Sequence, residues 1–464
     1  MLRSIITNNS TIRRYSIGLA SKKMSTTTTT TKQDPASLHN PYFFQKPGQK
    51  DIWSLINETA AQAQEEDPTN KIINLGQGFF SYNPPEFAID AVNDALIKPQ
   101  FNQYAHARGN PNLLKQIAAH YSKAYGREVP IEEVQITTGA NEGMFAIFFG
   151  YLTPGDEVIV FEPFFDQYIP NIEMTGAKIR YVEIKYPEKL NSQNVSGDDW
   201  EIDWETLEKS INSKTKMIVI NTPHNPIGKI FTKEELHRIG ELVIKNNLLL
   251  VSDEVYENLY YTPDFPRPAT LESLPELRER TFTVGSAGKS FAATGWRIGY
   301  IQGPAPLIKY VTAAHTRICF STPAPLQQAV SQAFSQVEEL NYFEKVRSDY
   351  VKKYKIFTEV FDELGLPYTK AQGGYFLLVN LSKLKIPKDY KFPQSILDRK
   401  TLDFKLAYWL IKEIGVVGIP PTEFLIESNR VGNGVENCIR FAVCKDDSIL
   451  KEAVEKLKLL KNYL

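Results

Sequence analysis

The chain has 464 residues, of which 42% are hydrophobic and 23% charged, a composition typical of a globular protein with about two or three domains. Its formal net charge of −1 at pH 7 excludes a strong overall attraction for nucleic acid or for an anionic membrane surface. No apolar run approaches the roughly 20 residues of a membrane-spanning helix. Cys319, Cys438 and Cys444 include no CxxC pair, which favours packed thiols in a reducing compartment over a disulfide framework or a metal site.

Residues 1–40 differ from the rest of the chain and are predicted to be a presequence followed by a disordered linker. They combine several basic residues with many serines and threonines, and no acidic residue precedes Asp34. This composition is typical of a mitochondrial presequence, and Met24 offers a second start that would give a cytosolic form. We therefore expect a mitochondrial location, a cytoplasmic one, or both. An untargeted disordered tail is the alternative interpretation.

The body of the chain contains four short runs of mostly apolar residues. They lie at residues 158–161, 216–220, 248–251 and 281–284. Runs of this kind are typical of strands that are buried on both faces of a sheet. Thr232 and Glu235 form a capping-box pattern after the second run, and apolar residues at helical spacing follow it. The alternation of strands and helices predicts an α/β fold with a mostly parallel central sheet flanked by helices.

The residues that follow these predicted strands are suited to bind a ligand. Asn225 lies in a loop with two prolines after the second run, and Asp253 follows the third. Ser286 and Lys289 follow the fourth. Ligands of open α/β sheets bind outside the carboxyl ends of the strands, so we expect these loops to open on one edge. No GxGxxG follows these strands and no Walker A motif is present, so the usual signals of a nucleotide site are lacking.

Lys289 and Asp253 are the candidate reactive groups. A lysine at the end of a buried strand is desolvated, which lowers the pKa of its amine and makes it a nucleophile for a carbonyl. A buried carboxylate needs a partner, and a protonated pyridine nitrogen would suit Asp253. Tyr256 lies three residues later, within reach of the same ligand. Taken alone, Lys289 also fits a surface loop and Asp253 a helix cap.

A second group of residues is suited to hold a phosphate. Arg297 supplies a fixed positive charge and several N–H donors, and the Ser286 hydroxyl would add another donor. Residues 139–143, which include Ala140 and Asn141, open an apolar helix. The first turn of a helix offers free backbone N–H groups and a partial positive charge. Together these residues predict an anion-binding site.

Arg440 lies among apolar residues near the C-terminus, in the run from Cys438 to Ala442. A buried guanidinium needs an anionic partner, and the α-carboxylate of an amino acid would accept two hydrogen bonds from it. An internal salt bridge is the alternative for this arginine.

The order and spacing of these residues resemble the class I and II aminotransferases of pyridoxal phosphate (PLP) fold type I, from about residue 41 to the C-terminus. Within this family the chain is most similar to the kynurenine aminotransferase group, also known as glutamine transaminase K or cysteine-conjugate β-lyase. The segments that carry the resemblance are Asn74–Phe79, Asn102–Tyr104, Glu162–Asp166, Asn221–Lys229, Ser252–Tyr256 and Gly285–Gly299.

The resemblance implies that the cofactor is PLP and gives roles to the residues around its ring. Lys289 would bind PLP as a Schiff base and move the proton between Cα and the cofactor. Asp253 would pair with the pyridine nitrogen, and Phe165 would stack on the ring. Tyr256 and Asn225 would hydrogen-bond the phenolic oxygen of the ring. No metal ion is implied.

The resemblance also assigns the phosphate, the substrate and a subunit contact. The phosphate would be held by Ser286, Arg297 and the backbone of Ala140 and Asn141. Tyr104 would reach the phosphate of a neighbouring subunit, which makes the protein a homodimer. The substrate would be bound by Gly78, Asn225, Arg440 and Trp53: Arg440 would clamp the α-carboxylate, Gly78 would close over it, and Trp53 would line the side-chain pocket.

The expected fold has a large domain around the central sheet and a smaller α+β domain built from both chain ends. The N-terminal arm and part of the small domain would occupy residues 41–84. The large PLP-binding domain would span residues 85–337, and the C-terminal small domain residues 338–464.

The expected activity is transamination, with kynurenine as amino donor, 2-oxoglutarate as acceptor and kynurenic acid as the cyclised product. Glutamine or another large neutral or aromatic amino acid is an alternative donor. The same site would also support β-elimination from cysteine S-conjugates, which yields pyruvate and a thiol. A non-catalytic PLP-fold module is the alternative of another class, but the residues before position 41 are too few for an attached DNA-binding domain.

Overall fold

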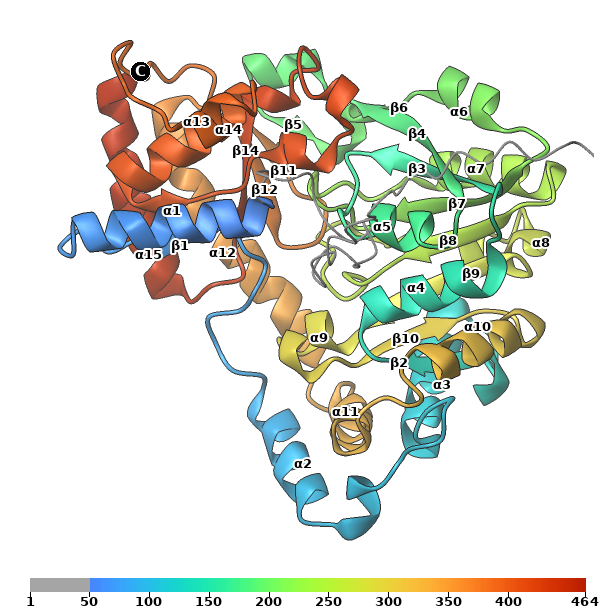
Figure 1. Ribbon diagram of the computed structural model, residues 1–464. Coiled ribbons are helices and arrows are strands. Elements are labelled where there is room, and N and C mark those ends of the chain that lie inside the picture. Colours follow the sequence, from blue (N-terminus) through green and yellow to red (C-terminus); the bar gives the residue numbers. More distant parts are fainter. Residues whose placement is uncertain (1–50) are drawn as a thin grey trace, which may run out of the picture. The chain divides into compact units, whose positions relative to one another are not determined.

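The structure of the protein is a computed structural model, in which residues 51–464 are described (Figure 1). The predicted presequence, Met24 and the linker lie outside the described residues, as does the start of the predicted N-terminal arm. No helix in the described part of the chain is long and apolar enough to cross a membrane.

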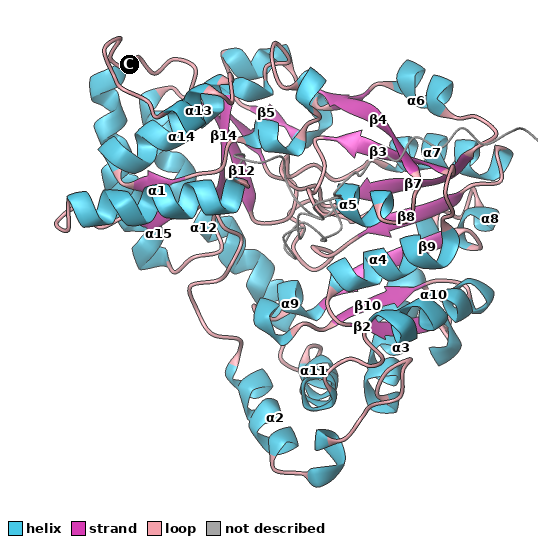
Figure 2. Ribbon diagram, in the orientation of Figure 1, coloured by secondary structure: helices cyan, strands magenta, loops and turns pink. Residues whose placement is uncertain are grey.

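The largest sheet of the described residues has eight strands (Figure 2). These are β2 (Val134–Thr137), β3 (Glu157–Glu162), β4 (Lys178–Lys185), β6 (Glu201–Ile202), β7 (Thr215–Asn221), β8 (Leu249–Asp253), β9 (Thr281–Ser286) and β10 (Gly299–Gln302). Their order is β2-β10-β9-β8-β7-β3-β4-β6. The strands β9, β8, β7, β3 and β4 are parallel to one another. The strand β10 is antiparallel to both β2 and β9, and β6 is antiparallel to β4. The prediction of a mostly parallel central sheet is confirmed.

Apolar side chains cover both faces of this sheet. On β3, Val158 and Val160 pack on one side, and Ile159 and Phe161 pack on the other. Successive side chains of a strand point to opposite faces, and here both faces are covered. The strands therefore have no polar alternation, which is why the four apolar runs were recognisable. They correspond to β3, β7, β8 and β9.

Helices bury the two faces of the large sheet. One face packs against α4 (Ala140–Tyr151), α5 (Tyr168–Glu173) and α10 (Ala305–Ile318), and the other against α6 (Trp204–Ser210) and α7 (Lys233–Lys245). Figure 1 shows α4, α5 and α10 in front of the sheet. The predicted capping box begins α7, because the Thr232 hydroxyl accepts from the Glu235 N–H and the Glu235 carboxylate accepts from the Thr232 N–H.

A smaller sheet and a strand pair form a second α+β region. The strands are β5 (Val195–Ser196), β11 (Tyr368–Lys370), β12 (Phe376–Asn380) and β14 (Cys438–Ala442), in the order β14-β12-β11-β5, and the pair β1 (Ile73–Asn74) with β13 (Val416–Val417). A shared core joins these strands, apart from β5, to α1 (Ile52–Glu66), α12 (Tyr342–Leu364), α13 (Gln394–Leu397), α14 (Leu402–Trp409) and α15 (Asp447–Leu457). The expected smaller α+β domain from both chain ends is therefore present, whereas its proposed boundaries stay a prediction.

Three helices extend the molecule beyond β2 and β10: α2 (Glu86–Leu96), α3 (Pro111–Tyr125) and α11 (Ala324–Gln336). Of the short helices, α8 (Pro275–Arg278) packs with α7, and α9 (Ala287–Ser290) follows β9. Residues of α2, α3 and α11 share a core with β2 and β10. Figure 1 shows α2 at the lower edge, below α11.

The strand register brings the predicted ligand loops to one edge of the large sheet. Asn221, the last residue of β7, pairs with Asp253, the last residue of β8. Asp253 in turn pairs with Val284 of β9, two residues before Ser286. The chain then forms α9, which contains Lys289. The acid, the amine and the serine are therefore placed around one edge by neighbouring parallel strands.

Candidate active site

A cavity of about 180 Å³ opens at this edge of the sheet. Among the residues selected from the sequence, its wall contains Ala140, Asn141, Phe165, Asn225, Asp253, Tyr256, Ser286, Lys289 and Arg297. The wall also contains Met144, Tyr168, Asn221 and Val255. An amine, an acid and a positively charged corner therefore surround one space. The roles that these residues would have toward a bound cofactor stay predictions.

Lys289 provides the amine of this cavity. It lies on α9, directly after β9, and its side chain is half-buried. Desolvation lowers the pKa of the amine to about 8, so a substantial neutral fraction exists near that pH. Only the neutral amine is a nucleophile. Nζ donates a hydrogen bond to Oη of Tyr375 at 2.7 Å, an environment unlike that of a surface-loop lysine.

Asp253 provides the acid, and its side chain is only 5% exposed. Tyr168 donates a hydrogen bond from Oη to Oδ2, and the backbone N–H of Val255 donates to Oδ1 at 3.2 Å. Burial outweighs these bonds and raises the pKa of Asp253 to about 6. A protonated nitrogen in the cavity would stabilise the ionised carboxylate.

The start of α4 and Arg297 form the positively charged corner. Ala140 and Asn141 occupy the first turn of α4, whose free N–H groups favour an anion. Arg297 donates from Nη1 to the backbone oxygen of Thr294 at 3.1 Å. Gly139 has a φ of 81°, and a Cβ there would lie 2.4 Å from Nη2 of Arg297. Only glycine therefore allows the guanidinium to approach the helix so closely.

Arg440 is a buried cation at the edge of the site, on β14 and 2% exposed. Nη1 donates to Oδ1 of Asn225 at 2.9 Å, Nη2 donates to the backbone oxygen of Gly76 at 3.0 Å, and Nε has no partner among the described residues. Burial lowers the pKa of Arg440 to about 10. Asp166 acts on Arg440 only through a longer-range charge interaction, and no described carboxylate forms an ion pair with it, so the internal salt bridge is not formed among the described residues. A carboxylate ligand beside Asn225 would supply the missing anion.

Gly78 lies in a loop whose backbone oxygens accept hydrogen bonds from a side chain directly before β12 and from another beyond β14. Tyr375, directly before β12, donates from Oη to the Gly78 oxygen at 3.0 Å. Lys445 donates to the oxygens of Gln77 and Phe79 at 3.3 and 2.7 Å. Gly78 itself is not part of the cavity wall, but Tyr375 connects it directly to Lys289.

Tyr168 and Tyr375 are candidate functional residues that the sequence interpretation missed. Tyr168 contacts Asp253 across 85 positions of the chain, and Tyr375 contacts Lys289 across 86 positions. No local pattern links residues so far apart. A partial signal existed for Tyr168, because it follows closely on Phe165 in a segment already selected.

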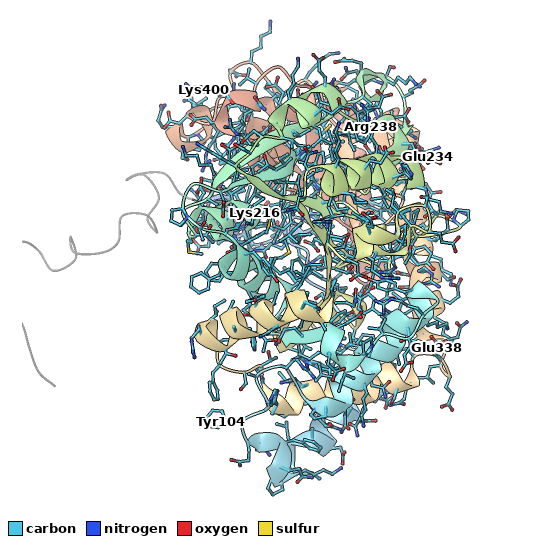
Figure 3. All side chains as sticks on the ribbon, turned by 90° about the vertical axis from the view of Figure 1, so that its right-hand side faces the viewer. Tyr104, Lys216, Glu234, Arg238, Glu338 and Lys400 are labelled. Carbon is cyan, nitrogen blue, oxygen red and sulfur yellow. The ribbon has the colours of Figure 1, made fainter. Side chains whose placement is uncertain are left out.

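Trp53 and Tyr104 lie outside the cavity wall. Trp53 donates from Nε1 to Oδ2 of Asp166 at 3.4 Å, next to Phe165, so it lies near the site. Tyr104 is 87% exposed, and its ring centroid lies 5.4 Å from that of Phe320. Figure 3 shows Tyr104 at the molecular surface. Its expected contact with the phosphate of a second subunit stays a prediction.

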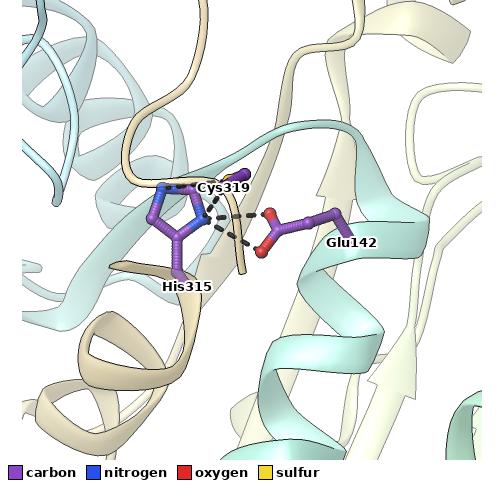
Figure 4. Close-up of side chains that lie close together, drawn as sticks. All are labelled: Glu142, His315 and Cys319. Atoms are coloured by element: carbon purple, nitrogen blue, oxygen red, sulfur yellow. Dashed lines mark hydrogen bonds and ion pairs between the residues drawn. The ribbon is translucent and has the colours of Figure 1, made fainter. Parts of the chain in front are cut away.

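Glu142, His315 and Cys319 form a cluster beside the start of α4 (Figure 4). Nδ1 of His315 lies 3.0 Å from both carboxylate oxygens of Glu142. Sγ of Cys319 lies 3.4 Å from Nδ1 and 3.9 Å from Nε2, which places the sulfur beside the ring rather than along the Nδ1 lone pair that a metal would use. The Glu142 carboxylate also accepts from the Thr138 N–H at 2.9 Å. We interpret the cluster as fastening the first turn of α4 to α10.

Comparisons with known proteins give a consistent result. The family model for aminotransferase class I and II matches residues 70–457. The chain is 54% identical over 433 residues to the Saccharomyces cerevisiae protein named "Probable kynurenine--oxoglutarate transaminase BNA3", covering 93% of this chain and 96% of the relative. It is 37% identical over 400 residues to the kynurenine--oxoglutarate transaminase of Dictyostelium discoideum, covering 84% and 91%.

A solved structure supports the same assignment. The crystal structure of Bna3p from Saccharomyces cerevisiae matches with a TM-score of 0.89 and 54% sequence identity, covering 92% of this chain and 99% of that chain. The fold is that of PLP fold type I, as expected from the sequence. The chain therefore belongs to the class I and II aminotransferases, a family of PLP-dependent enzymes, and is a transaminase.

Proposed function

We propose that this transaminase holds PLP at Lys289 and transfers the amino group of kynurenine to 2-oxoglutarate, with kynurenic acid as the cyclised product. The two relatives described above support the choice of substrates, because both are named kynurenine--oxoglutarate transaminase. The observation that carries the proposal is the buried guanidinium of Arg440. It contacts Asn225 in the wall of the cavity that contains Lys289, and no described carboxylate forms an ion pair with it.

The residues of the cavity fit PLP group by group. When bound, PLP supplies an aldehyde that takes up the amino group and a ring that withdraws electrons from Cα. Asp253 would hold the ring N–H, and this pairing would offset the burial that raises the pKa of Asp253 to about 6. The phosphate would lie at the corner formed by Arg297 and the first turn of α4, where Gly139 lets the guanidinium come close to the helix. Further ring and phosphate contacts would come from Phe165, Asn225, Tyr256, Ser286, Ala140 and Asn141.

The chain's own residues can orient the substrate and move its proton. Arg440 would bind the α-carboxylate through its guanidinium, in place of part of its present bonding to Asn225 and Gly76. This contact would fix Cα relative to Lys289. The freed Nζ of Lys289 would then take the proton from Cα and donate it to the carbon on the cofactor side of the transferred nitrogen. Its lowered pKa keeps a fraction of this amine unprotonated and ready to accept that proton.

We further propose that the enzyme is a homodimer in which Tyr104 serves the neighbouring active site. Tyr104 is 87% exposed and does not line the cavity of its own chain, which supports a role in another subunit. Sedimentation of the purified enzyme should give twice the mass of the 52.7 kDa chain. A monomer with full activity would contradict this proposal.

The targeting role of the leader is a proposal that rests on its basic, acid-free composition. A tagged full-length protein should be imported into mitochondria, and a form starting at Met24 should stay in the cytosol. Equal distribution of both forms would contradict the proposal.

Product analysis tests the proposed reaction. The purified enzyme with PLP is mixed with 2-oxoglutarate and, in separate samples, kynurenine, glutamine, an aromatic amino acid or a cysteine S-conjugate. Kynurenine should give kynurenic acid and glutamate in equal amounts. Lys289→Ala should give no product, whereas Lys216→Ala, which removes an exposed lysine, should keep activity.

The other possible products distinguish an error in the proposed donor from an error in the proposed reaction. Amino transfer from glutamine or the aromatic amino acid but not from kynurenine would overturn the proposed donor and leave the reaction class intact. Pyruvate and a thiol from the S-conjugate would show β-elimination. No amino transfer from any donor would overturn the proposal as a whole.

A further inference from the structure

Tyr375 connects the amine of Lys289 to the loop that contains Gly78. Nζ of Lys289 lies 2.7 Å from Oη of Tyr375, and Oη lies 3.0 Å from the backbone oxygen of Gly78. Among the described residues, Tyr375 is the only hydrogen-bond partner of this amine. Tyr375 is 0% exposed, so the oxygen that accepts this hydrogen bond is shielded from bulk water.

The chemistry of the three groups fixes the direction of both hydrogen bonds. The backbone oxygen of Gly78 can only accept, so the single proton of the Tyr375 hydroxyl is donated to it. The phenol oxygen is then left to accept from Lys289. Burial raises the pKa of Tyr375 well above its ordinary value, so the hydroxyl keeps its proton. Tyr375 therefore accepts a hydrogen bond from the Lys289 amine and does not act as a base.

The contact decides where the amine lies between two spaces. Lys289 lines the cavity that contains Asp253, and it also lines a second cavity of about 270 Å³ bounded by Tyr82 and Tyr350. An amine without a fixed partner has room to move toward either space. The hydroxyl of Tyr375 supplies that partner.

Close packing fixes the position of the Tyr375 hydroxyl. The Tyr375 ring lies 5.1 Å from the ring of Tyr256 and 4.8 Å from that of Phe376, measured between centroids. A Cβ on Gly78 would lie 2.9 Å from the Tyr375 ring and 3.1 Å from its hydroxyl. Gly78 therefore has to be glycine for the loop to approach the tyrosine.

The same loop also contacts the arginine proposed to bind substrate. Arg440 donates to the backbone oxygen of Gly76, two residues before the oxygen that Tyr375 holds. A carboxylate that draws Arg440 away from Gly76 would act on the loop that aligns the Tyr375 hydroxyl. The occupancy of the carboxylate site and the position of the amine are thus connected through three residues of backbone.

We propose that Tyr375 is a positioning residue that holds the Lys289 amine beside the reacting carbon and couples its position to the Gly76–Phe79 loop. This inference rests on the proposed function in that it takes Lys289 as the group that moves the proton at Cα. It adds a residue, and a link between the amine and the loop, that the fold alone does not imply.

The test compares Tyr375→Phe with the matched variant Tyr354→Phe. Tyr354 is another largely buried tyrosine, whose hydroxyl donates to the backbone oxygens of Gly374 and Phe376 on either side of Tyr375 but not to Lys289. Both variants lose one hydroxyl near the same strand. A purely structural effect should therefore be similar in the two.

Two measurements on the full chain distinguish the roles. In steady-state kinetics with a donor that the wild-type enzyme uses, Tyr375→Phe should lower kcat about tenfold and change KM much less, because the carboxylate clamp is intact. In the chain freed of cofactor, a small amine-reactive reagent modifies Lys289, and the rate of this labelling is measured as a function of pH. Peptide mass spectrometry confirms that the label is on Lys289. The apparent pKa of Lys289 should fall in Tyr375→Phe, because the charged amine loses its acceptor. Tyr354→Phe should change neither quantity.

Wild-type kcat together with an unchanged labelling profile in Tyr375→Phe would overturn the inference, and so would equal losses in both variants. The labelling measurement does not depend on turnover. If the wild-type enzyme transferred no amino group, the proposed function would fail, yet an unchanged or altered labelling profile would still decide whether Tyr375 holds the amine.

Discussion

Tyr168 and Asp253 form a hydrogen bond in which the phenol donates to Oδ2 of the carboxylate. Both side chains are buried, at 3% and 5% exposure. The bond lowers the pKa of Asp253, whereas desolvation raises it and prevails, with a result of about 6. Because this pKa lies only a little below neutral pH, the carboxylate is mostly ionised at pH 7, and a small further rise in its pKa would protonate much of it.

Tyr168→Phe should weaken the binding of PLP. The loss of the phenol raises the pKa of Asp253 further, so more of the acid is protonated at pH 7 and cannot pair with a protonated ring nitrogen. A hydrogen bond to a charged group contributes about 1.5–3 kcal/mol, so the Kd for PLP should rise roughly 10- to 100-fold. Fluorescence titration of the cofactor-free enzyme measures this Kd. Tyr151→Phe, which loses a hydroxyl bonded to the Leu307 oxygen, is the control, and an equal effect there would contradict the prediction.

Arg440→Lys should impair the use of every amino donor. Lysine retains the positive charge but cannot donate two parallel hydrogen bonds to one carboxylate. The loss should be about 1.5–3 kcal/mol, which lowers kcat/KM roughly 10- to 100-fold. Initial rates over a range of donor concentrations measure it. Arg238→Lys changes a half-exposed arginine paired with Glu208 and should behave as wild type. An unchanged kcat/KM in Arg440→Lys would show that the α-carboxylate binds elsewhere.

The rate of PLP capture by the cofactor-free enzyme should rise with pH and level off above about 8. The pKa of Lys289 is lowered to about 8, so the amine is protonated and unreactive below this value and neutral above it. The rate should increase about tenfold per pH unit on the acidic side. Stopped-flow absorbance between about pH 6 and 9.5 measures it. Pyridoxamine phosphate, which forms no bond to the lysine, serves as the control ligand, and the same rise with both ligands would refute the assignment to Lys289.

Gly78→Ala should reduce activity and stability together. The new Cβ would lie 2.9 Å from ring atoms of both Tyr375 and Phe376, so the loop or the rings must shift. Overpacking of this kind costs about 1–3 kcal/mol of unfolding free energy. Denaturant unfolding and initial rates measure the two effects. At Gly295 an added Cβ meets no atom within 4 Å, so Gly295→Ala is the stability control. Wild-type behaviour of Gly78→Ala would show that the contact is loose.

The central part of the fold and much of the cavity were predictable from the sequence for a simple reason. Strands such as β7 and β8 are buried on both faces, so they are continuously apolar, and the polar residues directly after them stand out. Asp253 and Lys289 could be selected in this way, and parallel strands then place them at one edge. Local sequence and global topology agree at these positions.

Other features depend on contacts between distant segments and had no local signature. Tyr375 and Tyr168 resemble ordinary core tyrosines until the fold brings them to Lys289 and Asp253. β5, from the middle of the chain, pairs with β11 near its end, and two residues are too few to show a pattern. That Arg440 bonds to an amide and a backbone oxygen, and forms no ion pair among the described residues, could be seen only once its surroundings were known.

In the proposed function, the two sheets of the molecule would divide the recognition of a substrate between them. Arg440 belongs to the small sheet, on β14, whereas Asp253 and the strand leading to Lys289 belong to the large one. Each sheet would bind a part that all α-amino acids and 2-oxo acids share: Arg440 the carboxylate, and the large sheet the carbon that exchanges its amino or oxo group. Such an enzyme could bind two acids with different side chains in turn, because neither of these two contacts would involve the side chain of the substrate.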